Sequence, residues 1–203
     1  MKFLYPGGGK SKMYGVITAP NHKGIPFGIV NGKPWAGDLG ALMGPDYVKK
    51  INLSKVAEWL PVMRPYKPQC LFLAGGDVVG NADATLETYA EFGRYFTDWP
   101  LAYVAQNGAE NLPIPADCAA VFIGGDTQWK ESIAAVSVIK RAQVMGKHIH
   151  IGRVNWGRRY RLFATLEGSE YFTCDGTRTR FDGREKTEKA WLSYEAQKPL
   201  ISI

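Results

Sequence analysis

The most constraining feature of this chain is a recurring pattern in which a short apolar run leads directly into glycine and a polar side chain. It occurs in PWAGD (34–38), CLFLAGGDVVG (70–80), LAYVAQNG (101–108) and AAVFIGGDTQWK (119–130). A buried parallel strand shows this pattern where its carboxyl end opens into a loop. Because such ends meet on one edge of a barrel or open sheet, we expect Asp38, Asp77, Gln106 and Asp126 on one rim. Ligand and catalytic sites are built on such rims, so the pattern favours an enzyme.

The whole chain alternates between strand and helix patterns. Candidate strands are Lys2–Tyr5, Gly15–Thr18, 35–37, Cys70–Ala74, Leu101–Ala105, Ala120–Ile123, His148–Ile151 and 171–174. Candidate helices are Leu53–Met63 with Ser54 as its cap, 83–97, 131–145 and 158–167. This alternation predicts an α/β fold, a compact (β/α)₈ TIM-like barrel. At 203 residues the barrel must be trimmed of some helices. A doubly wound open sheet is the alternative fold.

The length suits a single domain over residues 1–203. We divide it into a Gly/Pro/Lys-rich first segment (1–34), a barrel core (35–177) and a C-terminal extension (178–203). No apolar run approaches the roughly 18 residues that span a bilayer. The start, MKFLYPGGGK, is a poor signal peptide. We therefore expect a cytoplasmic protein with no membrane partner.

Metal and nucleotide cofactors are not expected. Cys70, Cys118 and Cys174 are too widely spaced for a CxxC zinc site, and a disulfide framework is not indicated. The histidines do not form an HExxH motif. Neither GxGxxG nor GxxxxGK[ST] follows a strand, which disfavours nucleotide binding of those kinds.

Positive charge is concentrated in one part of the chain. The net charge is +6, and the stretch 153–184 carries arginines but no lysine: Arg153, Arg158, Arg159, Arg161, Arg178, Arg180 and Arg184. A second basic group, Lys10, Lys12, Lys23 and Lys33, lies in the first segment. Arginine forks match phosphate geometry. Solvated surface charge is the alternative for any one residue, but the clustering favours a polyanionic partner, most simply nucleic acid.

The rim segments, taken in order, resemble the tRNA-guanine transglycosylase superfamily, in particular the short phage-type DNA-guanine transglycosylases (the DpdA-like branch). The resemblance covers about 34–177. It rests on PWAGDLGAL, GGDVVGNADATL, WPLAYVAQNGAE, VFIGGDTQWK, KHIHIGRVN and CDGT. Each motif alone is weak, but together, in the same order and each at a strand end, they are moderately specific.

The resemblance implies a pentosyltransferase of DNA modification, related in chemistry to queuosine formation. It would replace guanine in DNA with a free 7-deazaguanine, such as 7-cyano-7-deazaguanine, through a covalent aspartyl–C1′ intermediate. Matched motif by motif, Asp175 corresponds to the nucleophile and Asp38 to the acid/base. The base-binding positions are Asp77, Gln106, Gly124 and Gly125. An aspartate at a strand end is also often only a helix cap or turn residue.

Two departures from the family pattern matter. The tRNA enzymes carry a zinc site of three cysteines and one histidine near the C-terminus, and the cysteine spacing here does not match it. The final motif reads GSEYFTCDGT where the phage-type pattern is close to GCDSxDGT, which makes Glu170 a rival nucleophile to Asp175. The missing zinc region and the branch resemblance favour DNA over tRNA as the acceptor.

A guanine inside a duplex is out of reach, so the target base must be flipped out or the substrate single-stranded. We predict that Arg153, Arg158, Arg159 and Arg161 hold phosphates around it. Trp35, Trp129 and Trp156 stand beside rim motifs and are candidates for base stacking, with core packing as the alternative.

Two other classes of function stay open. One is an N-glycosidase or nucleoside deoxyribosyltransferase that uses the same carboxylates. The other is a non-catalytic nucleic-acid-binding protein on the same fold. The sequence does not decide which 7-deazaguanine, which sequence context or which oligomeric state applies. If the chain is phage-encoded, the host cytoplasm is the expected location.

Overall fold

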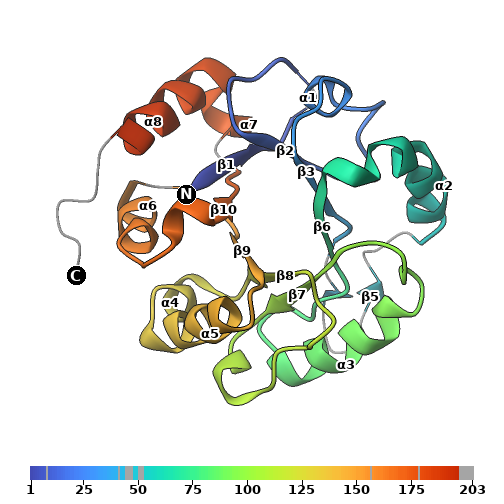
Figure 1. Ribbon diagram of the computed structural model, residues 1–203, viewed down its shortest axis with the longest axis vertical. Coiled ribbons are helices and arrows are strands. Elements are labelled where there is room, and N and C mark those ends of the chain that lie inside the picture. The colour runs from blue at the N-terminus through green and yellow to red at the C-terminus, as the bar shows by residue number, and fades with distance from the viewer. Residues whose placement is uncertain are drawn as a thin grey trace.

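The strands close into a barrel (Figure 1). In the computed structural model, which describes residues 1–7, 9–40, 42–43, 48–49, 53–155, 157–177 and 179–196, the barrel order is β1-β10-β9-β8-β7-β6-β3-β2. Its strands are β1 (Lys2–Tyr5), β2 (Gly15–Thr18), β3 (Trp35–Asp38), β6 (Cys70–Ala74), β7 (Leu101–Ala105), β8 (Ala120–Ile123), β9 (His148–Ile151) and β10 (Thr173–Cys174). Every barrel pairing is parallel. The predicted (β/α)₈ barrel is confirmed, and the open-sheet alternative is wrong.

The predicted strands all form, with one correction at the last. Strand β10 begins at Thr173 rather than at 171, because Ser169–Tyr171 makes a 3₁₀ turn after Gly168. Gly168 has a φ of 70°, a left-handed conformation that suits glycine. A separate antiparallel pair, β4 (Leu42–Met43) and β5 (Val48–Lys49), lies outside the barrel.

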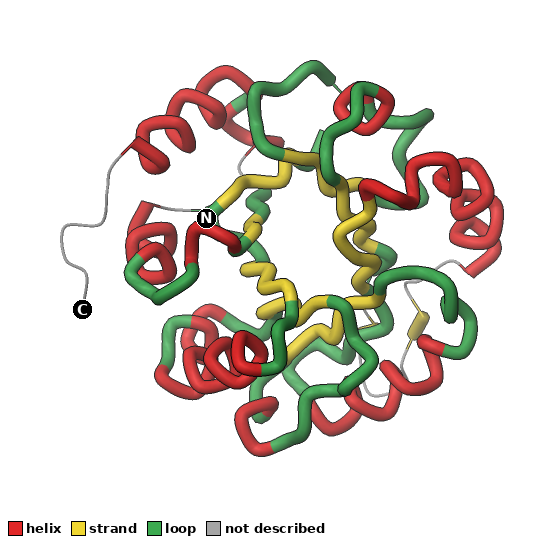
Figure 2. Tube along the Cα trace, in the orientation of Figure 1, coloured by secondary structure: helices red, strands yellow, loops and turns green. Residues whose placement is uncertain are grey.

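Helices surround the strands on the outside of the ring (Figure 2). They are α1 (Phe27–Val30), α2 (Leu53–Met63), α3 (Ala82–Gly93), α4 (Thr127–Lys130), α5 (Ile133–Val144), α6 (Gly157–Ala164), α7 (Thr179–Asp182) and α8 (Arg184–Ala196). Ser54 lies inside the first turn of α2 and does not precede it, so its prediction as the cap is wrong. Helices α3 and α6 each end before the predicted boundary.

The predicted helix over 131–145 forms as α5 (Ile133–Val144), and a separate short helix, α4 (Thr127–Lys130), precedes it. The Asp126 carboxylate accepts a hydrogen bond from the Trp129 backbone N–H at 2.8 Å, which caps α4. The Ser132 hydroxyl then donates to the Trp129 carbonyl at 2.6 Å, and α5 begins immediately after Ser132. Asp126 is therefore a helix cap, one of the two interpretations that its sequence context allows.

Two apolar layers hold the barrel together. Side chains such as Val121, Ile149 and Ile151 point outward and pack beneath the helices. Side chains such as Phe72, Val104 and Ala120 point inward and fill the barrel. Because side chains alternate across a strand, His148 and His150 share the inner face of β9. The barrel interior thus has an apolar side and a polar side.

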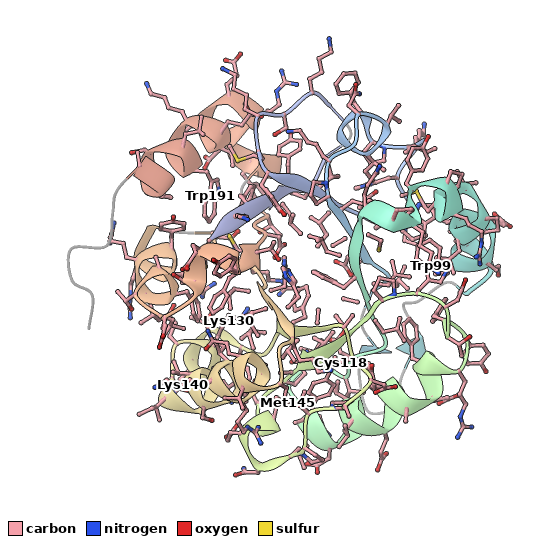
Figure 3. All side chains as sticks on the ribbon, viewed as in Figure 1. Trp99, Cys118, Lys130, Lys140, Met145 and Trp191 are labelled. Atoms are coloured by element: carbon pink, nitrogen blue, oxygen red, sulfur yellow. The ribbon has the colours of Figure 1, made fainter. Side chains whose placement is uncertain are left out.

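Both ends of the chain contribute to the barrel. Residues 1–34 supply β1 and β2, and the last segment supplies α8. Trp191 of α8 stacks on Phe3 of β1 with ring centroids 4.3 Å apart, and it lies between α8 and the barrel wall in Figure 3. Of the helices in the described residues, none is long and apolar enough to cross a membrane.

Candidate active site

A cavity of about 540 Å³ opens at the carboxyl-terminal end of the barrel strands. Two carboxyl groups line it, Asp38 at the end of β3 and Asp175 just after β10. Strands β1 and β2 lie between β10 and β3 in the barrel, and Pro6 and Thr18 from their ends line the same cavity. The cavity therefore spans the ends of four of the eight barrel strands, with one carboxyl group at each side.

Asp175 is held by donors aimed at a single oxygen. Its Oδ1 accepts a hydrogen bond from the Arg153 backbone N–H at 2.7 Å, and Nε2 of His150 lies 3.4 Å from the same oxygen. Burial by itself raises the pKa of Asp175. The hydrogen bond and charge of His150, the Arg153 N–H and the Lys130 ammonium together outweigh burial, so the net shift of the pKa is downward. Asp175 is therefore kept ionised while it faces the cavity.

The pKa of Asp38 is shifted in the opposite direction, upward. Its Oδ1 accepts a hydrogen bond from the Gly40 backbone N–H at 3.0 Å. The carboxyl group is open to the cavity, yet desolvation by the barrel around it raises its pKa, and the negative charge of Asp175 adds to this. The Gly40 N–H, Arg153 and His150 act against the rise without cancelling it. Asp38 therefore holds a proton more readily than an ordinary aspartate.

Asp77 and Gln106 form a buried pair on the neighbouring part of the rim. The Gln106 side-chain N–H donates to Asp77 Oδ2 at 2.6 Å. The amide oxygen of Gln106 accepts from the backbone N–H groups of Gly80 at 3.1 Å and Gly125 at 2.9 Å. Burial, with the charge of Asp38 as a further cause, raises the pKa of Asp77 to about 6 despite the Gln106 hydrogen bond. Gln106 ties together the loops that follow β6, β7 and β8.

The two glycines after β8 are required by this packing. A Cβ on Gly124 would lie 2.8 Å from the Gln106 amide nitrogen. Gly125 has a φ of 65°, and a Cβ there would overlap the Trp129 ring. Both glycines thus allow the backbone to pack closely, Gly124 against Gln106 and Gly125 against Trp129. This requirement is independent of any ligand.

The arginines after β9 divide into two kinds. Arg153 has a φ of 57°, which is unusual for a side-chain-bearing residue, and its side chain is exposed at the rim. Arg158 and Arg161 are also exposed on α6. Arg159 is only 13% exposed and bonds Glu131 at 2.9 Å, Thr127 Oγ1 at 2.6 Å and the Arg153 carbonyl at 2.9 Å. Arg159 therefore supports the loop, and phosphate binding by these residues stays a prediction.

Sequence reasoning missed several polar residues of the site, and two of them act directly on Asp175. His150 is fully buried and contacts Asp175. Lys130, on the α4 side of the barrel in Figure 3, is 3% exposed, and its ammonium donates to the Gly152 carbonyl at 2.8 Å. Burial lowers the pKa of Lys130 to about 8, although the charge of Asp175 opposes the shift. The alternating histidines of HIHI were a usable signal for His150, whereas Lys130 offered none.

The position of Glu170 bears on which carboxyl group is the better candidate for the nucleophile. Glu170 is exposed in the turn that precedes β10, so it lies at the amino-terminal end of the barrel, away from Asp38. Asp175, which follows β10, lies at the cavity. The geometry favours Asp175 over Glu170 as the reactive carboxylate.

The tryptophans beside the rim motifs pack in the interior. Trp35 is fully buried between Trp59 and Trp99, and its indole N–H donates to the Tyr66 carbonyl at 2.7 Å. Trp129 is also buried and donates to Glu110 at 2.8 Å. The core-packing alternative holds for these two, while Trp156 lies outside the described residues, as does Arg178 of the arginine cluster.

None of the three cysteines, all within the described residues, forms a disulfide bond; Cys118 and Cys174 are buried and Cys70 is half-buried. Within the part of the chain that the structure describes, no group of three or more His, Cys, Asp or Glu residues is arranged to hold a metal ion.

Comparison with known proteins adds no relative. No family model, no curated protein and no solved structure matches this chain. Chemically, the cavity offers one carboxylate held as an anion, one carboxyl group disposed to carry a proton, and a buried polar pair beside them.

Proposed function

We propose that this protein is a base-exchange transglycosylase that replaces guanine in DNA with a free 7-deazaguanine. The observation that carries the proposal is the pair of carboxyl groups on one cavity, with pKa shifts in opposite directions. A covalent base exchange needs an ionised nucleophile and a second group that moves protons. Asp175 and Asp38 meet those two requirements.

In the first half of the proposed reaction, a carboxylate oxygen of Asp175 forms a bond to C1′ of the target nucleotide. We assign the attack to Oδ2, because Oδ1 accepts the Arg153 hydrogen bond and faces His150. The bond from C1′ to guanine N9 breaks, its electron pair stays on the base, and protonated Asp38 supplies a proton to the leaving guanine. The deoxyribose is then held on Asp175 as an ester.

The second half reverses these steps with another base. Asp38, now ionised, takes the proton from N9 of the incoming 7-deazaguanine. N9 attacks C1′, the ester bond breaks, and the Asp175 carboxylate is regenerated. The exchange needs no water or metal, and a retained configuration at C1′ follows from the two displacements.

Base recognition is proposed for the Asp77–Gln106 pair with Gly124 and Gly125. The charge of Asp38 contributes to the raised pKa of Asp77, which supports a shared site. A carboxyl group near pKa 6 and an amide fixed by three hydrogen bonds provide acceptor and donor atoms for a purine edge. The exposed arginines Arg153, Arg158 and Arg161 would hold the phosphates of the flipped nucleotide.

The motif resemblance supports the same reading and favours DNA over tRNA. We also propose a cytoplasmic location, or the host cytoplasm for a phage-encoded chain. Neither the acceptor nor the location follows from the cavity itself.

The test is a base-exchange assay with the purified protein. Duplex DNA, single-stranded DNA and tRNA are each incubated with labelled guanine or 7-cyano-7-deazaguanine, digested to nucleosides and analysed by mass spectrometry. We expect incorporation into DNA that Asp175→Ala abolishes and that Asp38→Asn lowers by about 10²–10⁴-fold, the usual contribution of a proton-transferring group. Glu170→Ala is the matched control and should retain exchange.

Other outcomes identify the alternatives. Release of free guanine without incorporation would indicate an N-glycosidase. Exchange on free nucleosides but not on DNA would indicate a nucleoside deoxyribosyltransferase. DNA binding without either reaction, unaffected by Asp38→Asn, would indicate a non-catalytic binding protein.

A further inference from the structure

A line of polar side chains crosses the interior of the barrel beneath Asp175. Thr173 of β10 lies next to His148 and His150 of β9, because Thr173 and His150 are register partners in the parallel pair. The Thr173 hydroxyl oxygen lies 2.8 Å from His148 Nε2 and 2.9 Å from His150 Nδ1. His150 Nε2 then lies 3.4 Å from Asp175 Oδ1. The line begins at the first residue of β9 and ends at the cavity.

The chemistry of these groups sets the direction of the hydrogen bonds. An ionised Asp175 can only accept, so His150 Nε2 carries the hydrogen that faces it. When the His150 ring carries only that hydrogen, Nδ1 accepts from the Thr173 hydroxyl. The Thr173 oxygen in turn accepts from His148 Nε2–H. Burial is the main cause that lowers the pKa of His148 to about 4, so His148 is neutral at pH 7. One assignment of protons therefore satisfies every member.

The surroundings fix the His150 ring. It is fully buried, with the Phe122 ring centroid 4.5 Å away and that of Phe72 5.0 Å away. Asp175 is 14% exposed and lines the cavity, whereas His150 is not among the lining residues. A ligand in the cavity would thus meet Asp175, with His150 behind it. This excludes His150 as a base acting directly on substrate.

We propose that His150 is a positioning residue, which orients the Asp175 carboxylate toward the cavity and holds it as an anion through the hydrogen-bond line from His148 and Thr173. The inference deepens the proposed function and rests on it only for the role of Asp175 in base exchange. The orientation and ionisation of Asp175 by His150 can be measured without any substrate.

Other charged groups also face Asp175, and their effects on its pKa must be distinguished from the effect of His150. They are Arg153 in the loop after β9, Lys130 on α4 and Asp38 at the end of β3. His22 and Lys55 line the same cavity. A variant confined to His150 leaves all of these in place, so a change in Asp175 is then attributable to the histidine.

The first experiment is a substrate-free NMR titration. Carboxyl ¹³C signals of Asp175 are followed with pH in the wild type, in His150→Phe and in His150→Gln. Phenylalanine fits an aromatic pocket but removes the donor, so the Asp175 midpoint should rise by at least about one pH unit. Glutamine carries an N–H donor and should restore much of the shift. Cys174→Ala, on the same strand but facing the helices, is the matched control and should leave the midpoint unchanged.

The second experiment reads the tautomer of His150 from long-range ¹H–¹⁵N spectra. The Nε2–H form is expected in the wild type, and Thr173→Val should weaken that preference, because it removes the hydroxyl that donates to Nδ1. If His150→Phe does not fold, Thr173→Val and His150→Gln still test the proposal through these two signals.

The outcomes distinguish the positioning role of His150 from the proposed function in base exchange. An unchanged Asp175 midpoint in His150→Phe, or an Nδ1–H tautomer in the wild type, would overturn the positioning role. A raised midpoint together with a parallel shift of the acid limb of kcat/KM for base exchange supports both proposals. A raised midpoint in a protein that never exchanges bases supports the positioning role and contradicts the proposed function.

Discussion

Asp175 and Asp77 occupy similar places, each in a loop that follows a barrel strand, yet their environments act on them in opposite ways. Around Asp175, an imidazole, a backbone N–H and a nearby ammonium outweigh burial, and the pKa falls. Around Asp77, a neutral amide does not outweigh burial and the charge of Asp38, and the pKa rises to about 6. A hydrogen bond alone does not keep a buried carboxyl group ionised. The imidazole and backbone N–H donors and the nearby Lys130 charge make the difference at Asp175.

The sharpest test of this contrast uses the same change at both positions. Asp175→Asn removes the proposed nucleophile and should lower kcat for base exchange by at least about 10³-fold. Asp77→Asn removes a base contact and should act mainly on KM for the free base, by about 10–100-fold, the effect of one hydrogen bond to a charged group. Steady-state kinetics with varied 7-cyano-7-deazaguanine separate the two. Equal losses in kcat would contradict the division of roles.

The second prediction concerns stability and pH. Because the pKa of Asp77 is raised in the folded protein, its contribution to stability is present below about pH 4, its ordinary range, and is lost as the pH rises through about 6. Asparagine keeps an acceptor for Gln106 but does not ionise. As the pH rises from about 4 to above 6, the free energy of unfolding of Asp77→Asn should therefore increase by roughly 2–3 kcal/mol relative to that of the wild type.

Urea unfolding at several pH values measures that difference directly. Other titrating groups are common to both proteins and cancel in the comparison. A difference that does not change with pH would mean that the pKa of Asp77 is not raised.

The third prediction tests how much the Asp77 side depends on Gln106. Gln106→Ala leaves Asp77 and the N–H groups of Gly80 and Gly125 without this partner, and should cost about 2 kcal/mol or more. The adjacent Asn107 makes its hydrogen bonds with Asp126 near the surface. Asn107→Ala should cost about 1 kcal/mol or less, since water can replace them. Similar costs for both variants would show that burial of the Gln106 network is unimportant.

The smallest expected effects distinguish two neighbouring arginines on the Asp175 side. Arg159→Ala should lower stability by about 1 kcal/mol, because its buried guanidinium holds Glu131 and the Arg153 loop. Arg158 is 83% exposed, so Arg158→Ala should leave stability nearly unchanged. It should instead weaken DNA binding and reduce the slope of log K against log salt by about one. Salt-dependent fluorescence anisotropy checks this, and an unchanged slope would remove Arg158 from the DNA interface.

The strands were predictable because each apolar run ends in glycine and a polar residue, a local signal. Strand β10 was the exception: its predicted first residues instead form a 3₁₀ turn set up by Gly168. Helix α4 escaped prediction because it is a single turn, which the Asp126 cap starts and the hydrogen bond from the Ser132 hydroxyl to the Trp129 carbonyl follows. Local pattern therefore determines most of the barrel.

The site was only partly predictable for a different reason. Asp38 and Asp175 were found from their motifs, and the structure brings both to one cavity. The partners of Asp175 depend on the register of β9 against β10, which sequence periodicity does not reveal. The bond between Gln106 and Asp77 likewise joins residues on different strands' loops. Buried polar pairs of this kind are set by tertiary structure.

The most direct test of the account is to trap the covalent intermediate. The wild-type protein is mixed with guanine-containing DNA without added base, denatured rapidly, and analysed by intact mass and peptide mapping. The account predicts an adduct of one DNA strand lacking one guanine, attached through an ester at Asp175 and absent from Asp175→Asn. An adduct at another carboxylate such as Glu170, or base exchange that proceeds with no adduct at all, would contradict it.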